Sequence, residues 1–271
     1  MYDTMSLPYN YINKVLSLDT LRNIIGTEFN PINDINIFRN AFVHRSYCTR
    51  KNENFVNGNV KCPSNCLPLQ EESNERLEFL GDAVLNLIVG TYLFERYPDE
   101  NEGFLTKMRT KLVNGNMLAQ MASILNLGDH VIISKQVEDN QGRMNKNILE
   151  DCFEALLGAM FVDSKSNINK VSDWLVNFIE THIDFSELIT LNTNYKDIMM
   201  KHYQHTFCFT PKYYALDTET SNNTKIYYVC LKDNKGEVIA KGYGNTKKQA
   251  ENECARVALV ACGVDPTKAI N

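Results

Sequence analysis

The chain has 271 residues, of which 44% are hydrophobic and 23% charged, and its formal net charge is −5. This length allows two domains, and this balance excludes a disordered, fibrous or collagen-like chain. No N-terminal stretch joins a basic segment to an apolar run, and the densest apolar run, 152–162, is too short to cross a bilayer. We therefore expect an intracellular, cytoplasmic protein without a membrane partner, with the nucleus left open.

The charge is distributed unevenly along the chain. Residues 191–271 carry 11 Lys and Arg against 8 Asp and Glu, a balance of +3, whereas residues 1–190 carry 17 against 25, a balance of −8. A basic C-terminal part is typical of a domain that binds a polyanion. The acidic part does not exclude nucleic acid, because carboxylates that bind divalent cations add to such a surplus.

The eight cysteines are expected to be reduced thiols. Cys62 and Cys66 form a C-x3-C pair with Cys48 upstream. A zinc site needs further well-spaced ligands, and none is evident nearby.

The first half of the chain is predicted to be all-α. Residues 1–15 are expected to be an N-terminal tail, and 16–187 a large helical domain. Within it, 49–73 is rich in Asn and Pro and is predicted to form a long surface loop. Hydrophobic periodicity predicts helices before that loop and over Asn74–Tyr97, from the turn 99–103 to about Leu125, over Lys146–Asp163 and over Asn169–His182.

The second half follows a different pattern. A polar linker is expected at 188–194, and 195–265 is predicted to be a small α+β domain of order α-β-β-β-α. Its elements are a helix near 194–204, strands at 212–218, 225–232 and 237–243 with a hairpin turn at 233–236, and a final helix capped by Asn245-Thr246.

Acidic residues recur at helical spacing in the apolar helices. Glu75, Glu78 and Asp82 are spaced i, i+3 and i+7, and Asp151 and Glu154 stand at i and i+3. Each set shares a helix face, and together they can supply carboxylates to one hard cation, Mg²⁺ or Mn²⁺. Two unrelated solvated faces remain the alternative at this point. A di-iron site is disfavoured, since neither helix has a Glu-x-x-His pair.

Two metal ions held by carboxylates suit phosphodiester hydrolysis, in which one activates water and the other stabilises the leaving oxygen. No Ser-His-Asp or Cys-His arrangement competes with this chemistry. His44 is expected to be a structural or capping residue rather than a base.

The motifs resemble those of the ribonuclease III family. Residues 74–85 (NERLEFLGDAVL) resemble its signature, 42–46 (FVHRS) its HRS element, 101–113 (NEGFLTKMRTKLV) the helix that follows, and 149–158 (LEDCFEALLG) its second acidic motif. The resemblance covers about residues 20–265. Within that range, the C-terminal part of the chain is similar to the double-stranded RNA-binding domain.

The resemblance implies a role for each matched residue. The family's Mg²⁺-binding catalytic carboxylates, for which Mn²⁺ can substitute, correspond to Glu78, Asp82, Asp151 and Glu154. Two accessory acidic positions correspond to Glu75 and Glu102. An aromatic side chain that inserts into the partner subunit of a homodimer corresponds to Phe79. The implied activity is cleavage of both strands of double-stranded RNA, leaving 5′-phosphate and 3′-hydroxyl ends with short 3′ overhangs.

The expected RNA contacts of the C-terminal domain are electrostatic. Lys247 and Lys248 begin the final helix, where cations oppose the helix dipole but favour a bound phosphate, and Lys241 precedes them. The loop 221–225 lacks the family's Gly-Pro-x-His sequence, so only Asn223 and Lys225 are candidates there. We therefore expect weaker and more salt-sensitive binding than is usual in the family.

Two other classes of function stay open on the sequence alone. A nuclease fold without catalysis would bind or sequester duplex RNA, and a ribonucleoprotein subunit would not form a homodimer. Acidic residues at all four metal positions favour the enzyme. The biological RNA substrate is not indicated.

Overall fold

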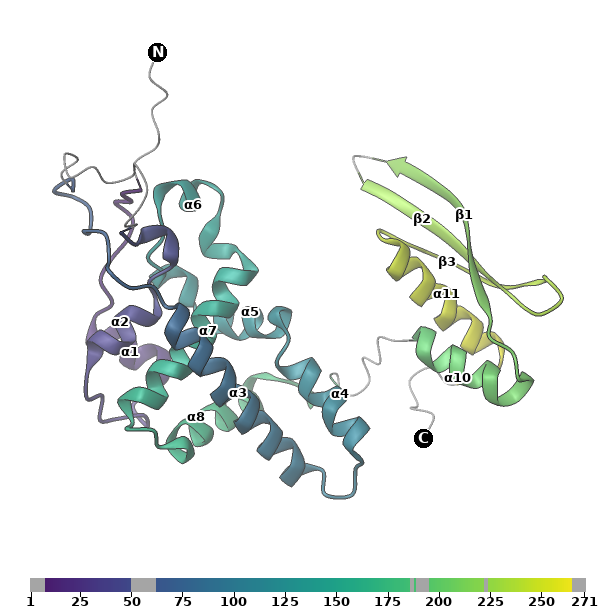
Figure 1. The fold of residues 1–271 in the computed structure, drawn as a ribbon, viewed down its shortest axis with the longest axis horizontal. Coiled ribbons are helices and arrows are strands. Elements are labelled where there is room, and N and C mark those ends of the chain that lie inside the picture. The colour runs from purple at the N-terminus through teal and green to yellow at the C-terminus, as the bar shows by residue number, and fades with distance from the viewer. Residues whose placement is uncertain (1–7, 50–61, 186–187, 189–194, 222–223, 265–271) are drawn as a thin grey trace, which may run out of the picture. The chain divides into compact units, whose positions relative to one another are not determined.

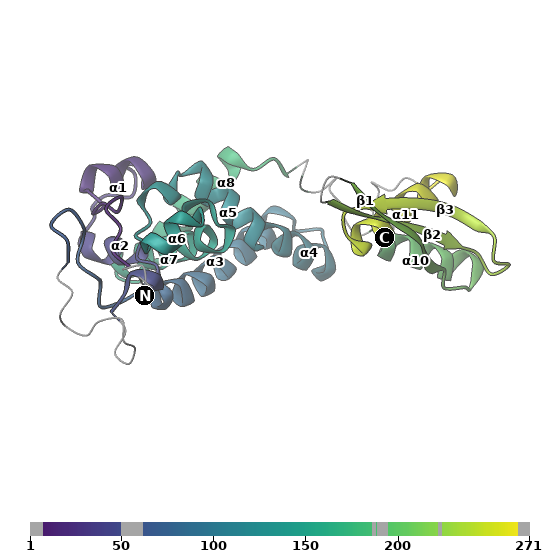
Figure 2. The same cartoon turned by 90° about the horizontal axis from the view of Figure 1, so that it is seen from above.

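The structure is a computed structural model that describes residues 8–49, 62–185, 188, 195–221 and 224–264. Parts of the predicted tail, of the loop 49–73 and of the linker 188–194 lie outside the described residues, as does Asn223. The chain separates into two compact units, residues 1–183 (unit 1) and 184–271 (unit 2). Figures 1 and 2 show each unit from two directions.

Unit 1 is helical, which confirms the predicted class of the first half. Short 3-10 turns, η1 (Arg45–Tyr47), η3 (Leu127–His130) and η4 (Gly142–Met144), connect some of the helices. The helices are α1 (Leu18–Ile25), α2 (Ile35–Ala41), α3 (Glu75–Arg96), α4 (Glu102–Leu112), α5 (Gly115–Ile124), α6 (Lys135–Asp139), α7 (Lys146–Asp163) and α8 (Ile168–His182).

Helix α7 forms the centre of this unit. Most of its side chains between Ile148 and Met160 are buried, including Phe153 and Leu156, which are fully covered. Helices α2, α3, α5 and α8 pack around it (Figures 1 and 2). A helix that is apolar nearly all round belongs in a core, so the acidic residues of α7 lie at the edge of that core.

Two glycines bring α3 and α7 into backbone contact. A Cβ atom at Gly81 of α3 would lie 1.7 Å from the carbonyl oxygen of Glu154, and one at Gly158 of α7 would lie 2.2 Å from the carbonyl oxygen of Leu77. No larger residue fits at either position without moving a backbone. The crossing therefore fixes the position of the α3 carboxylates against those of α7.

The predicted single helix from the turn 99–103 to about Leu125 is wrong, because the structure has two helices there. Asn114 separates α4 from α5: its Oδ1 accepts a hydrogen bond from the Met117 N–H (3.2 Å), and its Nδ2 donates to the Lys111 carbonyl oxygen (2.7 Å). A short amide side chain that caps one helix and closes another competes with a continuous helix. The apolar periodicity runs through the break and conceals it.

Helix α3 is, among the described helices, the one long and apolar enough to cross a membrane. A core helix of a globular unit passes the same test, so this is weak evidence for a membrane span. The helix bears three acidic residues in its first eight positions and packs along α7.

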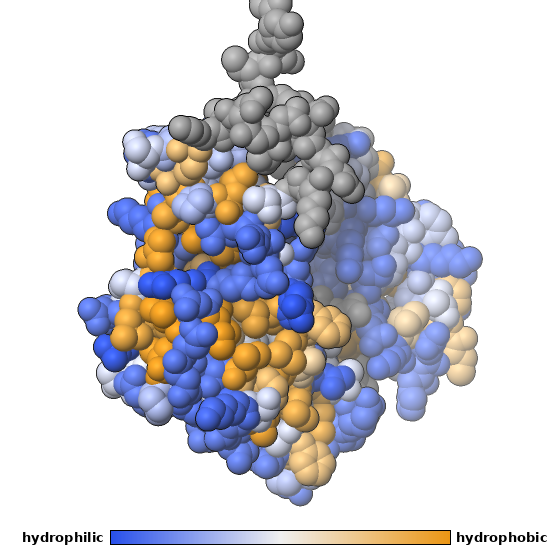
Figure 3. All heavy atoms as spheres, turned by 60° about the vertical axis from the view of Figure 1, so that its left-hand side comes forward, coloured by the Kyte–Doolittle hydropathy of each residue, from blue (hydrophilic) through white to orange (hydrophobic). Residues whose placement is uncertain are grey.

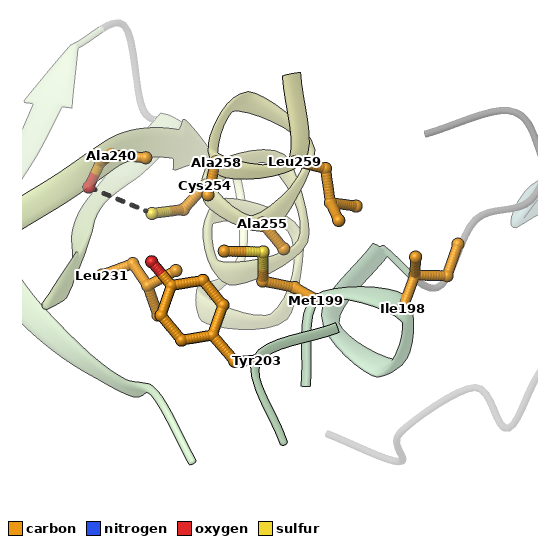
Figure 4. Close-up of a cluster of buried hydrophobic side chains, with 9 residues drawn as sticks. All are labelled: Ile198, Met199, Tyr203, Leu231, Ala240, Cys254, Ala255, Ala258 and Leu259. Atoms are coloured by element: carbon orange, nitrogen blue, oxygen red, sulfur yellow. Dashed lines mark hydrogen bonds between the residues drawn. The ribbon is translucent and has the colours of Figure 1, made fainter. Parts of the chain in front are cut away.

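Unit 2 has the predicted order α-β-β-β-α: α10 (Tyr195–Phe207), β1 (Lys212–Ser221), β2 (Thr224–Lys232), β3 (Val238–Gly244) and α11 (Lys247–Ala261). The strands form one antiparallel sheet in sequence order. Met199 and Tyr203 of α10 and Cys254 and Ala258 of α11 point toward Leu231 and Ala240 of the sheet (Figure 4). Both helices therefore cover the same face of the sheet.

Local hydrogen bonds explain where β2 ends and where β3 and α11 begin. Asp233 Oδ1 accepts from the N–H groups of Lys235 and Glu237, and Gly236 has φ 85°, as the hairpin turn requires. Thr246 Oγ1 accepts from the Gln249 N–H (3.2 Å) while Gln249 Oε1 accepts from the Thr246 N–H (3.1 Å), a capping box.

Candidate active site

An open acidic pocket of about 800 Å³ lies beside the α3–α7 crossing. Its polar lining includes His44 and Arg45 at the start of η1 and several amides from 136–147. Its acidic lining comes from both crossing helices, namely Glu75 and Glu78 of α3 and Glu150, Asp151 and Glu154 of α7. The structure thus brings four of the six acidic candidates from the sequence to one pocket.

The other two acidic candidates lie outside this lining. Asp82 is exposed one turn after Glu78, and its Oδ1 accepts a hydrogen bond from Asn86 Nδ2 (2.8 Å). Its charge nevertheless acts on Glu154. Glu102 is exposed at the start of α4 and accepts a hydrogen bond from Thr106 Oγ1 (2.8 Å). Asp82 is therefore a neighbour of the pocket, whereas Glu102 is placed on a separate helix.

Burial beside like charges perturbs the pocket carboxyls. Desolvation, followed by repulsion from Asp82, Glu150, Glu78 and Asp151, raises the pKa of Glu154 to about 8. Desolvation is also the main cause of the raised pKa values of Glu78 and Asp151, to which neighbouring carboxylates add. The pocket therefore holds more negative charge than its surroundings compensate.

Arg45 provides opposite charge at one side of the pocket. Its Nη1 lies 3.6 Å from Glu75 Oε1, and it lowers the pKa of both Glu78 and Asp151 against the larger effect of desolvation. Both partners of this ion pair are largely exposed, so the pair itself contributes little to stability.

The residues of the pocket fit a hard divalent cation in chemistry and charge. Carboxylate oxygens are the ligands that Mg²⁺ prefers, and a cation would relieve the repulsion that raises the pKa of Glu154. In the described part of the chain, no three His, Cys, Asp or Glu side chains are gathered closely enough to form a finished metal site. The fit therefore rests on the donor set and on the uncompensated charge.

His44 caps η1, which agrees with its predicted structural role. Its Nδ1 accepts from the Ser46 N–H (3.2 Å), and the hydroxyl of Ser46 lies 2.8 Å from the same nitrogen. Desolvation, and then the charge of Arg45, lower the pKa of His44.

Sequence reasoning missed Glu150 and Arg45. Glu150 stands four residues before Glu154 and so shares its helix face, a spacing that could have indicated it. Arg45 lies in a motif far from Glu75 along the chain, and no local spacing relates the two.

An apolar stripe marks one side of α3. Phe79, Leu87 and Phe94 are 81%, 59% and 71% exposed, and their spacing of eight and seven residues places them within one quadrant of the helix. Hydrophobic side chains also gather in patches on the surface of unit 1, separated by hydrophilic ones (Figure 3). Exposed apolar side chains gathered on one helix face are typical of an interface.

The candidate RNA-binding lysines occupy different places in unit 2. Lys247 and Lys248 are exposed in the first turn of α11. Lys241 is exposed on β3 next to Gly242, which approaches the backbone of α11, so its side chain leaves the opposite face of the strand. Lys225 is exposed at the start of β2, with Nζ 5.2 Å from the ring centre of Tyr227.

Two family models match the chain. Residues 34–179 match one described as "Ribonuclease-III-like", and residues 195–260 match one described as "Double-stranded RNA binding motif". Both lie where the corresponding units lie in the structure.

Curated relatives of the chain are named as ribonuclease 3. "Probable ribonuclease 3" of Acanthamoeba polyphaga mimivirus is 35% identical over 247 residues, which are 90% of this chain and 45% of that protein. "Ribonuclease 3" of Nitratiruptor sp. is 34% identical over 226 residues, 83% of this chain and 89% of that protein. The nuclease domain of ribonuclease III from Campylobacter jejuni, a solved structure, is 32% identical, covers 62% of this chain and 96% of that one, and has a TM-score of 0.49.

Proposed function

The chain belongs to the ribonuclease III family of double-stranded RNA endoribonucleases, and from this membership we propose that it cuts duplex RNA at the acidic pocket of unit 1. The proposed ligands of two Mg²⁺ ions are Glu78, Asp82, Asp151 and Glu154. The observation that carries this assignment is the α3–α7 crossing at Gly81 and Gly158, where two acidic helices lie in backbone contact. Desolvation and neighbouring carboxylates there raise the pKa of Glu154 to about 8.

The pocket residues have distinct tasks in this proposal. The four carboxylates would hold the ions. When bound, such ions activate a water molecule and stabilise the charge of the leaving oxygen. Glu75, held by Arg45, and Glu102 assist RNA binding, and the products carry 5′-phosphate and 3′-hydroxyl ends with short 3′ overhangs.

We further propose that two chains pair through the stripe of Phe79, Leu87 and Phe94. The described residues of one chain form the acidic pocket at α3 and α7 once, and a staggered cut of both strands needs two such pockets. The nuclease domain is proposed to span 16–187 and the RNA-binding domain 195–265, joined by the linker 188–194. A cytoplasmic location stays a prediction.

Cleavage of long duplex RNA in Mg²⁺ by the variants Glu154→Gln and Asp82→Asn tests the site. We expect each variant to cleave more slowly by roughly a hundredfold or more, as when one preorganised electrostatic group is removed from an active site. Asp173→Asn, an exposed change on α8, is the matched control and is expected to keep full activity.

Full activity in both site variants would refute the assignment of the ligands. Intact RNA with the wild-type protein in Mg²⁺ and in Mn²⁺, together with tight duplex binding, would instead identify a sequestering protein on the same fold.

A further inference from the structure

The three-stranded sheet of unit 2 has a second face that α10 and α11 do not cover. Tyr213 and Leu231 pair across β1 and β2, and Leu231 lies in the core under the helices (Figure 4). Side chains alternate along a strand, so the next register, Tyr214 with Cys230 and Cys230 with Lys241, faces away from the helices. We call this side of the sheet the outer face.

The outer face carries both tyrosines and lysines. Lys232 Nζ lies 5.2 Å from the ring centre of Tyr214, which is 45% exposed. Tyr228 and Tyr243 pair across β2 and β3 with ring centres 6.3 Å apart, and Tyr243 is 66% exposed. Tyr214 and Tyr243 are on the two outer strands, about 10 Å apart across the sheet at the usual strand spacing.

This combination matches the chemistry of one class of ligand. Exposed aromatic rings on a sheet stack on unpaired nucleobases, and lysines between them neutralise the phosphates. An RNA duplex keeps its base faces stacked inside the helix, so it offers these rings nothing to stack on. Tyr214 shares its register with Cys230 and Lys241, and Tyr243 stands two residues further along β3, so the two rings lie on a diagonal of the sheet. One extended strand that crosses the sheet can therefore contact both rings with bases that are not neighbours.

We propose that the outer face binds single-stranded RNA, with bases stacked on Tyr214 and Tyr243 and phosphates near Lys232 and Lys241. Lys247 and Lys248, the residues proposed to contact duplex, lie on α11 at the other side of the sheet. Unit 2 thus has separate surfaces for paired and unpaired RNA. This inference is independent of the cleavage chemistry of unit 1.

Fluorescence anisotropy of the full chain in EDTA tests the proposal, with a labelled 12-nucleotide oligouridylate and a blunt RNA duplex as probes. The double variant Tyr214→Leu/Tyr243→Leu keeps apolar bulk and removes both rings. We expect its Kd for the oligouridylate to rise by about tenfold or more and its Kd for the duplex to stay unchanged. Tyr11→Leu, an exposed tyrosine of unit 1, is the control and is expected to change neither value.

A charge variant supplies a second readout. Lys232→Ala is expected to lower the slope of log K against log salt for the oligouridylate by about 0.7, the value for one phosphate contact on a single strand. Lys235→Ala, in the exposed hairpin turn, is the control and is expected to leave the slope unchanged.

The proposal is overturned if the wild-type chain does not bind the oligouridylate, if the double variant binds it as tightly, or if both probes weaken equally. Should the double variant fail to fold, photocrosslinking of wild type to 5-iodouridine RNA decides. Crosslinks at Tyr214 or Tyr243 support the outer face, and crosslinks confined to other residues refute it.

Discussion

Glu154 shows how a single residue reports on the state of the site. Its carboxyl group lies between α3 and α7, where desolvation and neighbouring carboxylates raise its pKa to about 8. In the metal-free protein it therefore carries a proton at neutral pH. With the proposed ligands, a bound Mg²⁺ would displace that proton, because only the carboxylate form coordinates, so the affinity for Mg²⁺ is expected to rise with pH up to about 8.

The metal-free protein is expected to lose stability as pH rises. The folded state keeps the Glu154 proton up to pH about 8, whereas the unfolded chain releases it near 4.5, so the stabilising contribution is complete below 4.5 and is lost as pH approaches 8. Glu78 and Asp151 act in the same direction. Urea denaturation in EDTA at pH 5.5 and 8.5 measures the effect.

Glu154→Gln is the control for this pH dependence, because its amide does not titrate. We expect a smaller fall in the free energy of unfolding between the two pH values than in the wild type. An equal fall in both proteins would mean that Glu154 does not hold a proton in the folded state.

Among the contacts between elements, the crossing of α3 and α7 sets the positions of the pocket carboxylates. Gly158→Ala places a methyl carbon 2.2 Å from the Leu77 carbonyl oxygen, so the two helices must move apart. We expect a loss of about 1–3 kcal/mol in the free energy of unfolding, together with loss of cleavage as the two carboxylate pairs separate.

Gly90→Ala provides the matched comparison on α3. A Cβ at Gly90 meets nothing within 4 Å in the single chain, so the better helix propensity of Ala is expected to raise the stability of the chain itself by up to about 1 kcal/mol. Urea denaturation of both variants tests this difference; equal stabilities would show that the crossing tolerates a side chain.

The start of α11 is the second informative element. Two lysines in its first turn oppose the helix dipole, so Lys247→Ala/Lys248→Ala is expected to leave the stability of unit 2 unchanged or slightly higher. The same change is expected to lower the slope of log K against log salt for duplex RNA by about 1.8, or about 0.9 for each phosphate that is no longer neutralised. Lys235→Ala serves as control, and an unchanged slope in the double variant would remove these lysines from the RNA interface.

At the scale of the whole molecule, the stripe on α3 predicts the assembly. Phe79→Glu places a charge within the proposed apolar contact and is expected to convert a dimer of twice the 31.0 kDa chain mass into monomers. Light scattering after size-exclusion chromatography measures this mass. Tyr11→Glu, an equally polar change at another exposed aromatic, is expected to leave the dimer intact. A monomeric wild type would contradict the pairing.

Local patterns were sufficient for the class of each unit. Helical periodicity in the first half and β-branched and aromatic runs around a turn in the second predicted an all-α unit and an α-β-β-β-α unit, because backbone propensity and side-chain alternation act between near neighbours. The acidic spacings of α3 and α7 were visible for the same reason. Periodicity failed at Asn114, where a capping side chain interrupts a helix without interrupting its apolar stripe.

Long-range packing determines which of the acidic and basic residues lie close together. It brings Glu78 and Asp151, more than seventy residues apart in the chain, to one pocket with Arg45 and Glu150, and it leaves Glu102 outside that lining. It also turns Lys241 away from α11, toward the side of the sheet that carries Tyr214. Residue spacing along the chain is enough to show which residues share a face of one element. Which faces meet, and how far their charges are desolvated, depends on long-range packing, here on two glycines that let α3 and α7 touch.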